Sequence, residues 1–195
     1  MDDTDRSTLA RVAAGDQRAL AELYTRHGQA LLAYAEGLLG ERQAAEEALQ
    51  DTFLAVWRAA ASFEGRSAVR TWLFGICRRQ ALTRLRRPGP GTVPVDSAGE
   101  LPAGEPGPEA IALARADARA VGAAISALSP RHREVLDLAF GAGMSYRDIA
   151  TVLGVPEGTV KSRLFQARNH LARALAPVSE PVPGPRRGWS EEEPG

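Results

Sequence analysis

The sequence is poor in the residues that build disulfides, metal sites and membrane spans. Cys77 is the only cysteine among 195 residues, which excludes an intramolecular disulfide and a cysteine zinc site. The histidines lack metal-ligand spacing, no apolar run approaches the ~20 residues that cross a bilayer, and the acidic N-terminus does not resemble a signal peptide. We therefore expect a cytoplasmic protein with no metal, no cofactor and no membrane insertion, in which Cys77 is a core thiol.

Aromatic residues are also scarce, at 6% of the chain, and no run of alternating apolar and polar residues predicts a β-strand. Apolar residues recur at helical spacing, which predicts an all-α fold. Residues 88–111 are rich in proline, glycine and acidic side chains, and are predicted to form a flexible linker between helical domains at 1–87 and 112–176. Residues 177–195 are predicted to be disordered for the same reason.

Charge is balanced overall but uneven along the chain. The 24 basic and 24 acidic residues give a formal net charge of zero. Between residues 66 and 87, however, there are seven arginines and no acid, and between 157 and 177 four cations stand against Glu157 alone. Acidic residues collect between these segments and near the C-terminal end. This pattern favours nucleic-acid binding by a protein that stays soluble when free.

Helix boundaries follow from capping and breaking residues. The N-terminal domain is predicted to contain helices over 8–14, from an N-cap at Asp16 to Gly40 with an interruption near Gly28, over 42–61, and from a cap at Ser67 to Arg87. The helix over 42–61 carries an apolar stripe that we expect to be buried: Ala45, Leu49, Phe53, Val56 and Ala60. In the C-terminal domain, helices are predicted over 112–128 and over 130–140, the second after a Ser129 cap.

Residues 144–175 form the most specific segment and are predicted to be a helix-turn-helix. Ser145 and Asp148 form a capping box, Gly154 breaks the first helix, and Pro156 suits the start of the second. Along the second helix, four apolar residues recur on one stripe that we expect to be buried: Val160, Leu164, Ala167 and Leu171.

The opposite side of this second helix is polar. Gly158, Ser162 and Asn169 point away from the stripe and are flanked by cations. Such a face suits the major groove of DNA, where short polar groups meet base edges and Lys or Arg meet phosphates. The alternative is an ordinary amphipathic helix with a solvated basic face. The coincidence of cap, tight turn and excess cations favours DNA.

The helix predicted to end near Arg87 is also basic. Arg79 and Arg86 share one side and are candidates for backbone or base contacts with DNA. The alternative is that Arg78, Arg84 and Arg87 only cap the helix C-terminus and interact with its dipole. No nucleophile, paired carboxylate, phosphate loop or metal cluster is evident, so we do not expect an enzyme.

Two sequence blocks occur in a characteristic order and spacing. They are AEEALQDTFLAVWRAAASFEGRSAVRTWLFGICRRQALTRLRR, from Ala45, and ALSPRHREVLDLAFGAGMSYRDIATVLGVPEGTVKSRLFQARNHL, from Ala127. With these blocks the chain resembles a bacterial sigma factor of the extracytoplasmic-function (ECF) class of the sigma-70 superfamily, which has only regions 2 and 4. The similarity spans roughly residues 17–87 and 112–175.

The resemblance implies that the protein binds core RNA polymerase through the clamp helices and flap, directs it to promoters and helps open the duplex. It also allows for an anti-sigma factor that clamps between the two domains. The residues that it places on polymerase are Glu47, Gln50, Asp51 and Leu54. The minus-ten candidates, in the loop at 62–67 and the helix after it, are Phe63, Arg66, Arg79 and Arg86. The minus-thirty-five candidates are Glu157, Thr159, Lys161, Ser162, Arg163 and Arg168.

Three points stay open. Phe63 either captures an unstacked base or folds back into the core. Arg79 and Thr83 stand where many members carry Asn and Asp, so the promoter sequence is not predicted. Finally, a conventional DNA-binding activator or repressor would bind an operator stably without polymerase, and a purely protein-binding adaptor would leave the basic helices unexplained. A sigma factor is expected to bind DNA only weakly by itself.

Overall fold

The computed structural model describes residues 2–86 and 119–176, and all regular structure within these ranges is helical. The first range contains α1 (Asp2–Ala13), α2 (Gln17–Leu39), α3 (Arg42–Ala59), the 3-10 turn η1 (Ala60–Ser62) and α4 (Val69–Leu85). The second contains a helical segment at 119–126, α6 (Pro130–Leu136), the π-helical turn η2 (Asp137–Gly141), α7 (Tyr146–Leu153) and α8 (Glu157–Ala174). The all-α prediction is confirmed. The predicted linker and the predicted disordered tail lie outside the described residues.

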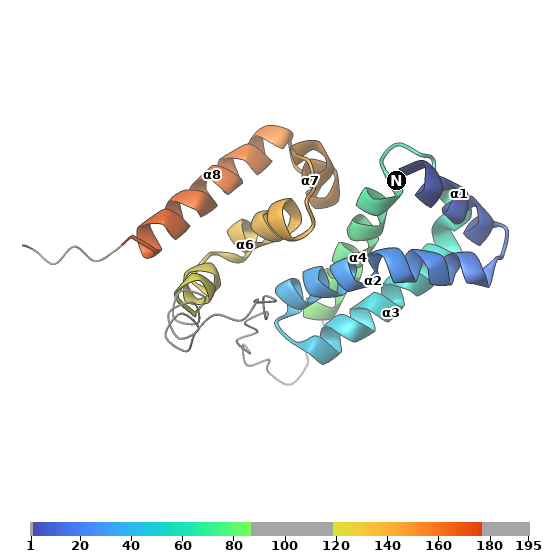
Figure 1. Ribbon diagram of the computed structural model, residues 1–195, viewed down its shortest axis with the longest axis horizontal. Coiled ribbons are helices and arrows are strands. Elements are labelled where there is room, and N and C mark those ends of the chain that lie inside the picture. The colour runs from blue at the N-terminus through green and yellow to red at the C-terminus, as the bar shows by residue number, and fades with distance from the viewer. Residues whose placement is uncertain (1, 87–118, 177–195) are drawn as a thin grey trace, which may run out of the picture.

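Helices α1 to α4 form one bundle, and α6 to α8 lie beside it (Figure 1). The stripe expected on α3 is buried and consists of Ala45, Leu49, Phe53, Val56 and Ala60, the last of these in η1. Cys77 is buried on α4, where its thiol donates to the carbonyl of Leu31 at 3.6 Å. Burial raises the pKa of the Cys77 thiol to about 11. The thiol therefore stays protonated, as expected for a core residue.

The predicted caps of α2 are present. The Asp16 carboxylate accepts from the amides of Arg18 and Ala19, at 2.9 and 3.2 Å, and Gly40 ends the helix with φ of 70°. The interruption expected near Gly28 does not occur. Gly28 is buried within a continuous α2, where the Tyr24 ring lies 3.5 Å from the position that a Cβ would take.

The predicted cap at Ser67 is wrong. Helix α4 starts at Val69, and Ala68 is in the N-cap position without a side-chain cap. The Ser67 hydroxyl instead donates to the carbonyl of Ala68 at 3.3 Å. The first turn of α4 is fixed by packing, since Val69 and Thr71 are both buried.

The helix predicted over 130–140 is present, but it is α-helical only over Pro130–Leu136 and continues as a π-helical turn over Asp137–Gly141. Its α-helical part ends at Leu136, and the amide of Ala142 closes a π-turn onto the carbonyl of Asp137 at 2.8 Å. The turn buries Leu138 and brings Met144 back toward it, which sets the start of the helix-turn-helix. Among the described residues, no helix is long and apolar enough to cross a membrane.

Candidate nucleic-acid interface

Helices α7 and α8 form the predicted helix-turn-helix. The Ser145 hydroxyl accepts from the amide of Asp148 at 3.2 Å, and Gly154 ends α7 with φ of 66°. One part of the capping box differs from expectation. Asp148 accepts from the Ser145 hydroxyl at 2.5 Å, and its other oxygen accepts from Thr71 of α4 at 2.9 Å. That second bond ties the start of α7 to the first bundle.

Helix α8 presents the polar face that the sequence predicts. Val160, Leu164 and Ala167 are buried and Leu171 is half-buried. Of the minus-thirty-five candidates, Glu157, Lys161, Ser162 and Arg168 are exposed, and Thr159 and Arg163 are half-buried. Glu157 and Lys161 form an ion pair at 3.1 Å, so in the free chain each partly neutralises the other.

Sequence reasoning missed Phe165. Its side chain is 66% exposed on α8, three residues before Arg168 and four after Lys161. Phe165 is five residues after Val160, a spacing that places it away from the buried stripe. This spacing could have predicted its exposure from the sequence. An exposed aromatic on a DNA-reading face provides apolar contact for a thymine methyl group.

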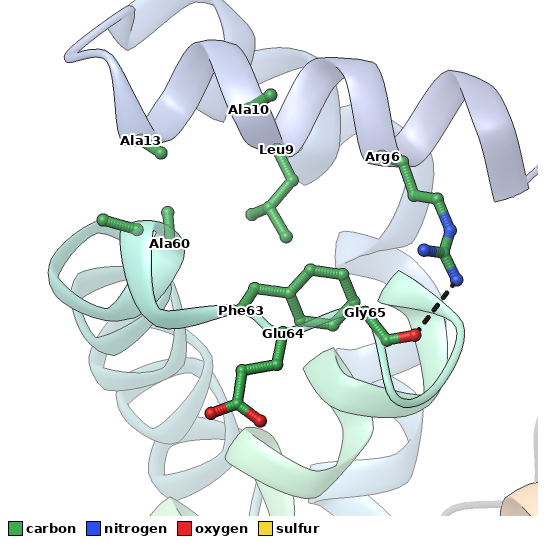
Figure 2. Close-up of a pocket in the computed structure, with 9 residues that line it drawn as sticks. Arg6, Leu9, Ala10, Ala13, Ala60, Phe63, Glu64 and Gly65 are labelled. Atoms are coloured by element: carbon green, nitrogen blue, oxygen red, sulfur yellow. Dashed lines mark hydrogen bonds between the residues drawn. The ribbon is translucent and has the colours of Figure 1, made fainter.

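A groove of about 440 Å³ lies beside the predicted minus-ten loop (Figure 2). Its lining residues come from α1, η1 and the loop, and are Arg6, Leu9, Ala10, Ala13, Ala60, Ala61, Phe63, Glu64 and Gly65. The Phe63 ring is half-buried and packs against the ring of Trp72, with centroids 5.2 Å apart. Phe63 therefore packs on the core and also lines an open groove, and its capture of an unstacked base stays a prediction.

The remaining minus-ten candidates lie around this loop and on α4. Arg66 is exposed and pairs with Glu64, while Arg79 is exposed on α4 and Arg86 is exposed at its C-cap position. The alternative that Arg78 and Arg84 only cap α4 is wrong, because both make specific ion pairs with other elements. Arg87 lies outside the described residues.

Arg84 joins α4 to the predicted polymerase-binding face of α3. Its guanidinium pairs with Glu47 and, at 2.6 Å, with Asp51. Gln50 is exposed, and Leu54 is an exposed apolar side chain with 54% of its surface accessible. The structure thus brings two of these four residues onto one arginine and leaves Leu54 uncovered.

Arg78 reaches the C-terminal helices. Its Nε donates to Glu134 of α6 at 2.8 Å, and the Tyr34 hydroxyl of α2 donates to the same carboxylate oxygen at 3.0 Å. Glu134 is only 8% exposed. Burial raises the pKa of the Tyr34 phenol, and the Glu134 charge adds to this effect, so Tyr34 remains a hydrogen-bond donor.

Further bonds hold α6, η2 and α7 against α2 and α4. Arg70 donates to the carbonyl of Ala142, and the Asp137 carboxylate lies so close to Gly37 that an added Cβ would be 3.0 Å from its oxygen. The sequence did not predict this docking. Glu134 is 56 residues from Arg78 and 100 residues from Tyr34, and the spacing of residues within one helix gives no information on contacts at such separations. Among residues 2–86 and 119–176, no cluster of potential metal ligands occurs.

Comparisons with known proteins agree with this arrangement. Residues 23–89 match the family Sigma-70 region 2, and residues 118–171 match the family Sigma-70, region 4. The chain is 35% identical over 187 residues to RNA polymerase sigma factor CnrH of Cupriavidus metallidurans, covering 92% of this chain and 98% of that protein. It is 36% identical over 174 residues to ECF RNA polymerase sigma factor SigM of Mycobacterium tuberculosis, covering 88% and 85%.

Solved structures show the same fold. The structure of CnrH in complex with the cytosolic domain of CnrY superposes with a TM-score of 0.65 at 30% identity, covering 88% of this chain and 96% of that one. The sigma factor RpoE in complex with the anti-sigma factor NepR, from Bartonella quintana, gives a TM-score of 0.59 at 28% identity, covering 80% and 95%. This family consists of transcription factors and is not known for catalysis. With both sigma-70 regions in order and close relatives along nearly its whole length, the chain belongs to the ECF RNA polymerase sigma factors.

Proposed function

We propose that this sigma factor binds core RNA polymerase through α3 and brings it to promoters, where α8 reads the minus-thirty-five element and the loop at 62–67 with α4 engages the minus-ten element. One observation carries the proposal: α8 buries Val160, Leu164 and Ala167 and leaves the opposite face exposed. A DNA-reading helix needs such a free face, and an ordinary core helix does not.

On the minus-thirty-five element, the exposed side chains of α8 divide by chemistry. Lys161 and Arg168 suit phosphates, and Ser162 is short enough to bond a base edge. Lys161 exchanges its pairing with Glu157 for a phosphate, which leaves the Glu157 carboxylate to accept from a cytosine amino group. Phe165 packs on a thymine methyl group.

On the minus-ten element, the groove beside Phe63 receives one unstacked base of the non-template strand. Stacking of a base on an aromatic side chain contributes about 1–3 kcal/mol and is largely independent of sequence. The support for this role is that Phe63 is held by Trp72 and still lines an open groove. Arg66 is an exposed cation in the loop, Arg79 is exposed further along α4 and Arg86 at its C-terminal end, and these three contact the phosphates of the strand.

Polymerase binds the face of α3 that carries Leu54 and the carboxylates of Glu47 and Asp51. Leu54 provides apolar contact area. Arg84 sets the positions of the two carboxylates, which orient the complex and provide charge complementarity to polymerase. Gln50 is exposed on the same helix, and its side-chain amide can both donate and accept hydrogen bonds.

The docked arrangement of the two regions opens during initiation. Promoter elements at minus ten and minus thirty-five are about 25 base pairs apart, or about 85 Å along the duplex at ~3.4 Å per pair. In the docked arrangement, Tyr34 and Arg78 bond Glu134 of the other region at 3.0 and 2.8 Å. The two regions therefore cannot keep these bonds while each binds its own promoter element.

An anti-sigma factor would act by stabilising the docked arrangement. The relative RpoE has been solved with the anti-sigma factor NepR, which supports a partner of this kind. The polymerase supplies the catalysis, so the chain itself is not an enzyme and acts in the cytoplasm, where polymerase is present.

Run-off transcription with purified core polymerase tests the proposal. Genomic fragments of the source organism are transcribed with core alone, with core plus the full chain, and with core plus a Lys161→Ala/Arg168→Ala variant. We expect discrete transcripts only with the intact chain. A conventional activator or repressor would instead bind a genomic fragment stably without polymerase and would give no transcript when core polymerase is added.

A further inference from the structure

We propose that α1 is part of the minus-ten machinery, with Arg6 as a positioning residue that fixes the loop beside Phe63. The inference rests on the function proposed above for that loop. Helix α1 precedes residues 23–89, which match the sigma-70 region 2 family, so neither the family match nor the sequence assigns it a role.

Arg6 reaches from α1 onto the backbone of the loop. Its Nη2 donates to the carbonyls of Gly65 and Ser67, each at 3.4 Å (Figure 2 shows the first bond). The contact is close, because a Cβ added at Gly65 would lie 2.9 Å from Nη1 of Arg6. Gly65 also has φ of 71°, a conformation that other residues rarely adopt. Both features fit a backbone that must approach the guanidinium closely.

The part of α1 that carries Arg6 is anchored to α2. The preceding residue, Asp5, is only 2% exposed and accepts from Arg26 of α2 at 2.6 Å, while its second oxygen bonds His27 at 2.9 Å. Leu9, one turn further along α1, is also buried. Helix α1 is therefore anchored to α2 on one side of Arg6, and the guanidinium transfers that fixed position to the loop.

The loop needs such support because it has no regular structure between Phe63 and Ala68. Phe63 and Gly65 both line the groove, and Arg6 and Leu9 form the facing wall. A loop that samples several conformations must lose that freedom when a base enters, which weakens binding. Arg6 removes part of this cost before the base arrives.

The test compares three variants in the holoenzyme. Arg6→Ala removes the two bonds to the loop carbonyls. Arg6→Lys keeps the positive charge and can donate to one of these carbonyls, and Arg11→Ala is the matched control on the same helix. Arg11 pairs with Asp16 and Glu22 and does not line the groove, and about half of its side chain is exposed. The DNA probes are the genomic fragment that gives most transcript in the run-off assay and a single-stranded oligonucleotide carrying its non-template minus-ten sequence.

Arg6→Ala is expected to weaken oligonucleotide binding by about three- to tenfold, and to slow promoter opening, followed by permanganate reactivity of unpaired thymines, by a similar factor. Arg6→Lys is expected to recover about half of the loss on a logarithmic scale, and Arg11→Ala to match the wild type. Affinity for core polymerase is expected to stay unchanged in all three, because α3 is not touched.

Two results would overturn the inference while leaving the proposed function intact. One is wild-type oligonucleotide binding and opening with Arg6→Ala. The other is an equal loss of oligonucleotide and core affinity, which indicates general damage to the bundle. If the wild-type chain neither transcribes nor binds the oligonucleotide, the proposed function itself fails, and this inference fails with it.

Discussion

Replacing Arg78 with alanine should loosen the docking of the two regions without unfolding either one. Arg78 is the charged partner of Glu134, whose carboxylate is buried between α2, α4 and α6. In the variant, the carboxylate keeps only the Tyr34 hydroxyl as a donor. A buried carboxylate that loses its cation is unfavourable, because its solvation is not restored.

The size of the effect follows from burial. Removing one partner of a buried ion pair costs about 3–5 kcal/mol. The Arg78 side chain is 25% exposed, so water enters the space it leaves, and we expect the lower end of that range, about 3 kcal/mol. This corresponds to a factor of about 150 in the equilibrium between docked and separated regions.

Urea unfolding with two probes measures this. Two of the three tryptophans, Trp57 and Trp72, belong to the first bundle, so the change in fluorescence reports mainly on it, while far-ultraviolet circular dichroism reports on all helices. In the wild type we expect the two curves to coincide. In Arg78→Ala the helical signal of α6 to α8 should be lost at lower urea than the fluorescence change. X-ray scattering in the absence of urea should show a larger radius of gyration.

Two further variants sharpen the test. Tyr34→Phe removes one bond to the same carboxylate and is expected to act in the same direction with a smaller effect, about 1.5 kcal/mol. Arg79→Ala, at the neighbouring exposed position, should change the unfolding midpoints by less than about 0.5 kcal/mol in free energy. Coincident, unshifted curves for Arg78→Ala would show that Glu134 does not hold the regions together.

Three other predictions concern separate surfaces. Phe165→Ala should reduce transcription about fivefold from promoters that depend on the minus-thirty-five element, measured by run-off yield, with unchanged core binding. Leu54→Asp should weaken binding to labelled core polymerase at least about tenfold without lowering the unfolding midpoint, because Leu54 is exposed. Burial raises the pKa of Asp137 to about 6, so its favourable contribution is complete below pH 4 and is lost as pH rises through 6. Asp137→Asn should therefore match the wild type near pH 4 and be about 2 kcal/mol more stable at pH 8, as measured by urea unfolding.

Much of the fold follows from local signals in the sequence. The Asp16 cap, the left-handed Gly40 and Gly154, and the α3 stripe all lie where spacing and residue type predicted them. Each depends on contacts within a few residues, which the sequence displays directly. The Ser67 cap failed because tertiary packing of Val69 set the start of α4, and no pattern within one helix reveals such packing.

The candidate site was partly predictable for the same reason. Periodicity alone separates the exposed Lys161 and Ser162 from the buried Val160. The partners of Arg78 and Arg84 were not predictable, because an arginine looks the same in sequence whether it meets a phosphate, a helix end or a distant carboxylate. Seven arginines in one segment favoured nucleic-acid binding, whereas the structure directs Arg70 and Arg78 toward the other region and leaves Arg79 exposed.

This division of α4 explains how docking can be reversible. The bonds of Glu134 and Asp148 to α2 and α4 are polar on both sides, so water and phosphates can satisfy the same groups once the regions separate. Each bond therefore contributes only a modest net free energy while fixing a definite geometry. Separation also exposes apolar side chains, because the buried residues of both regions form one apolar cluster, but the buried stripe of α8 stays covered within its own region by α6 and α7. A partner that binds only the separated regions, as polymerase and promoter together would, can displace these contacts without disrupting either fold.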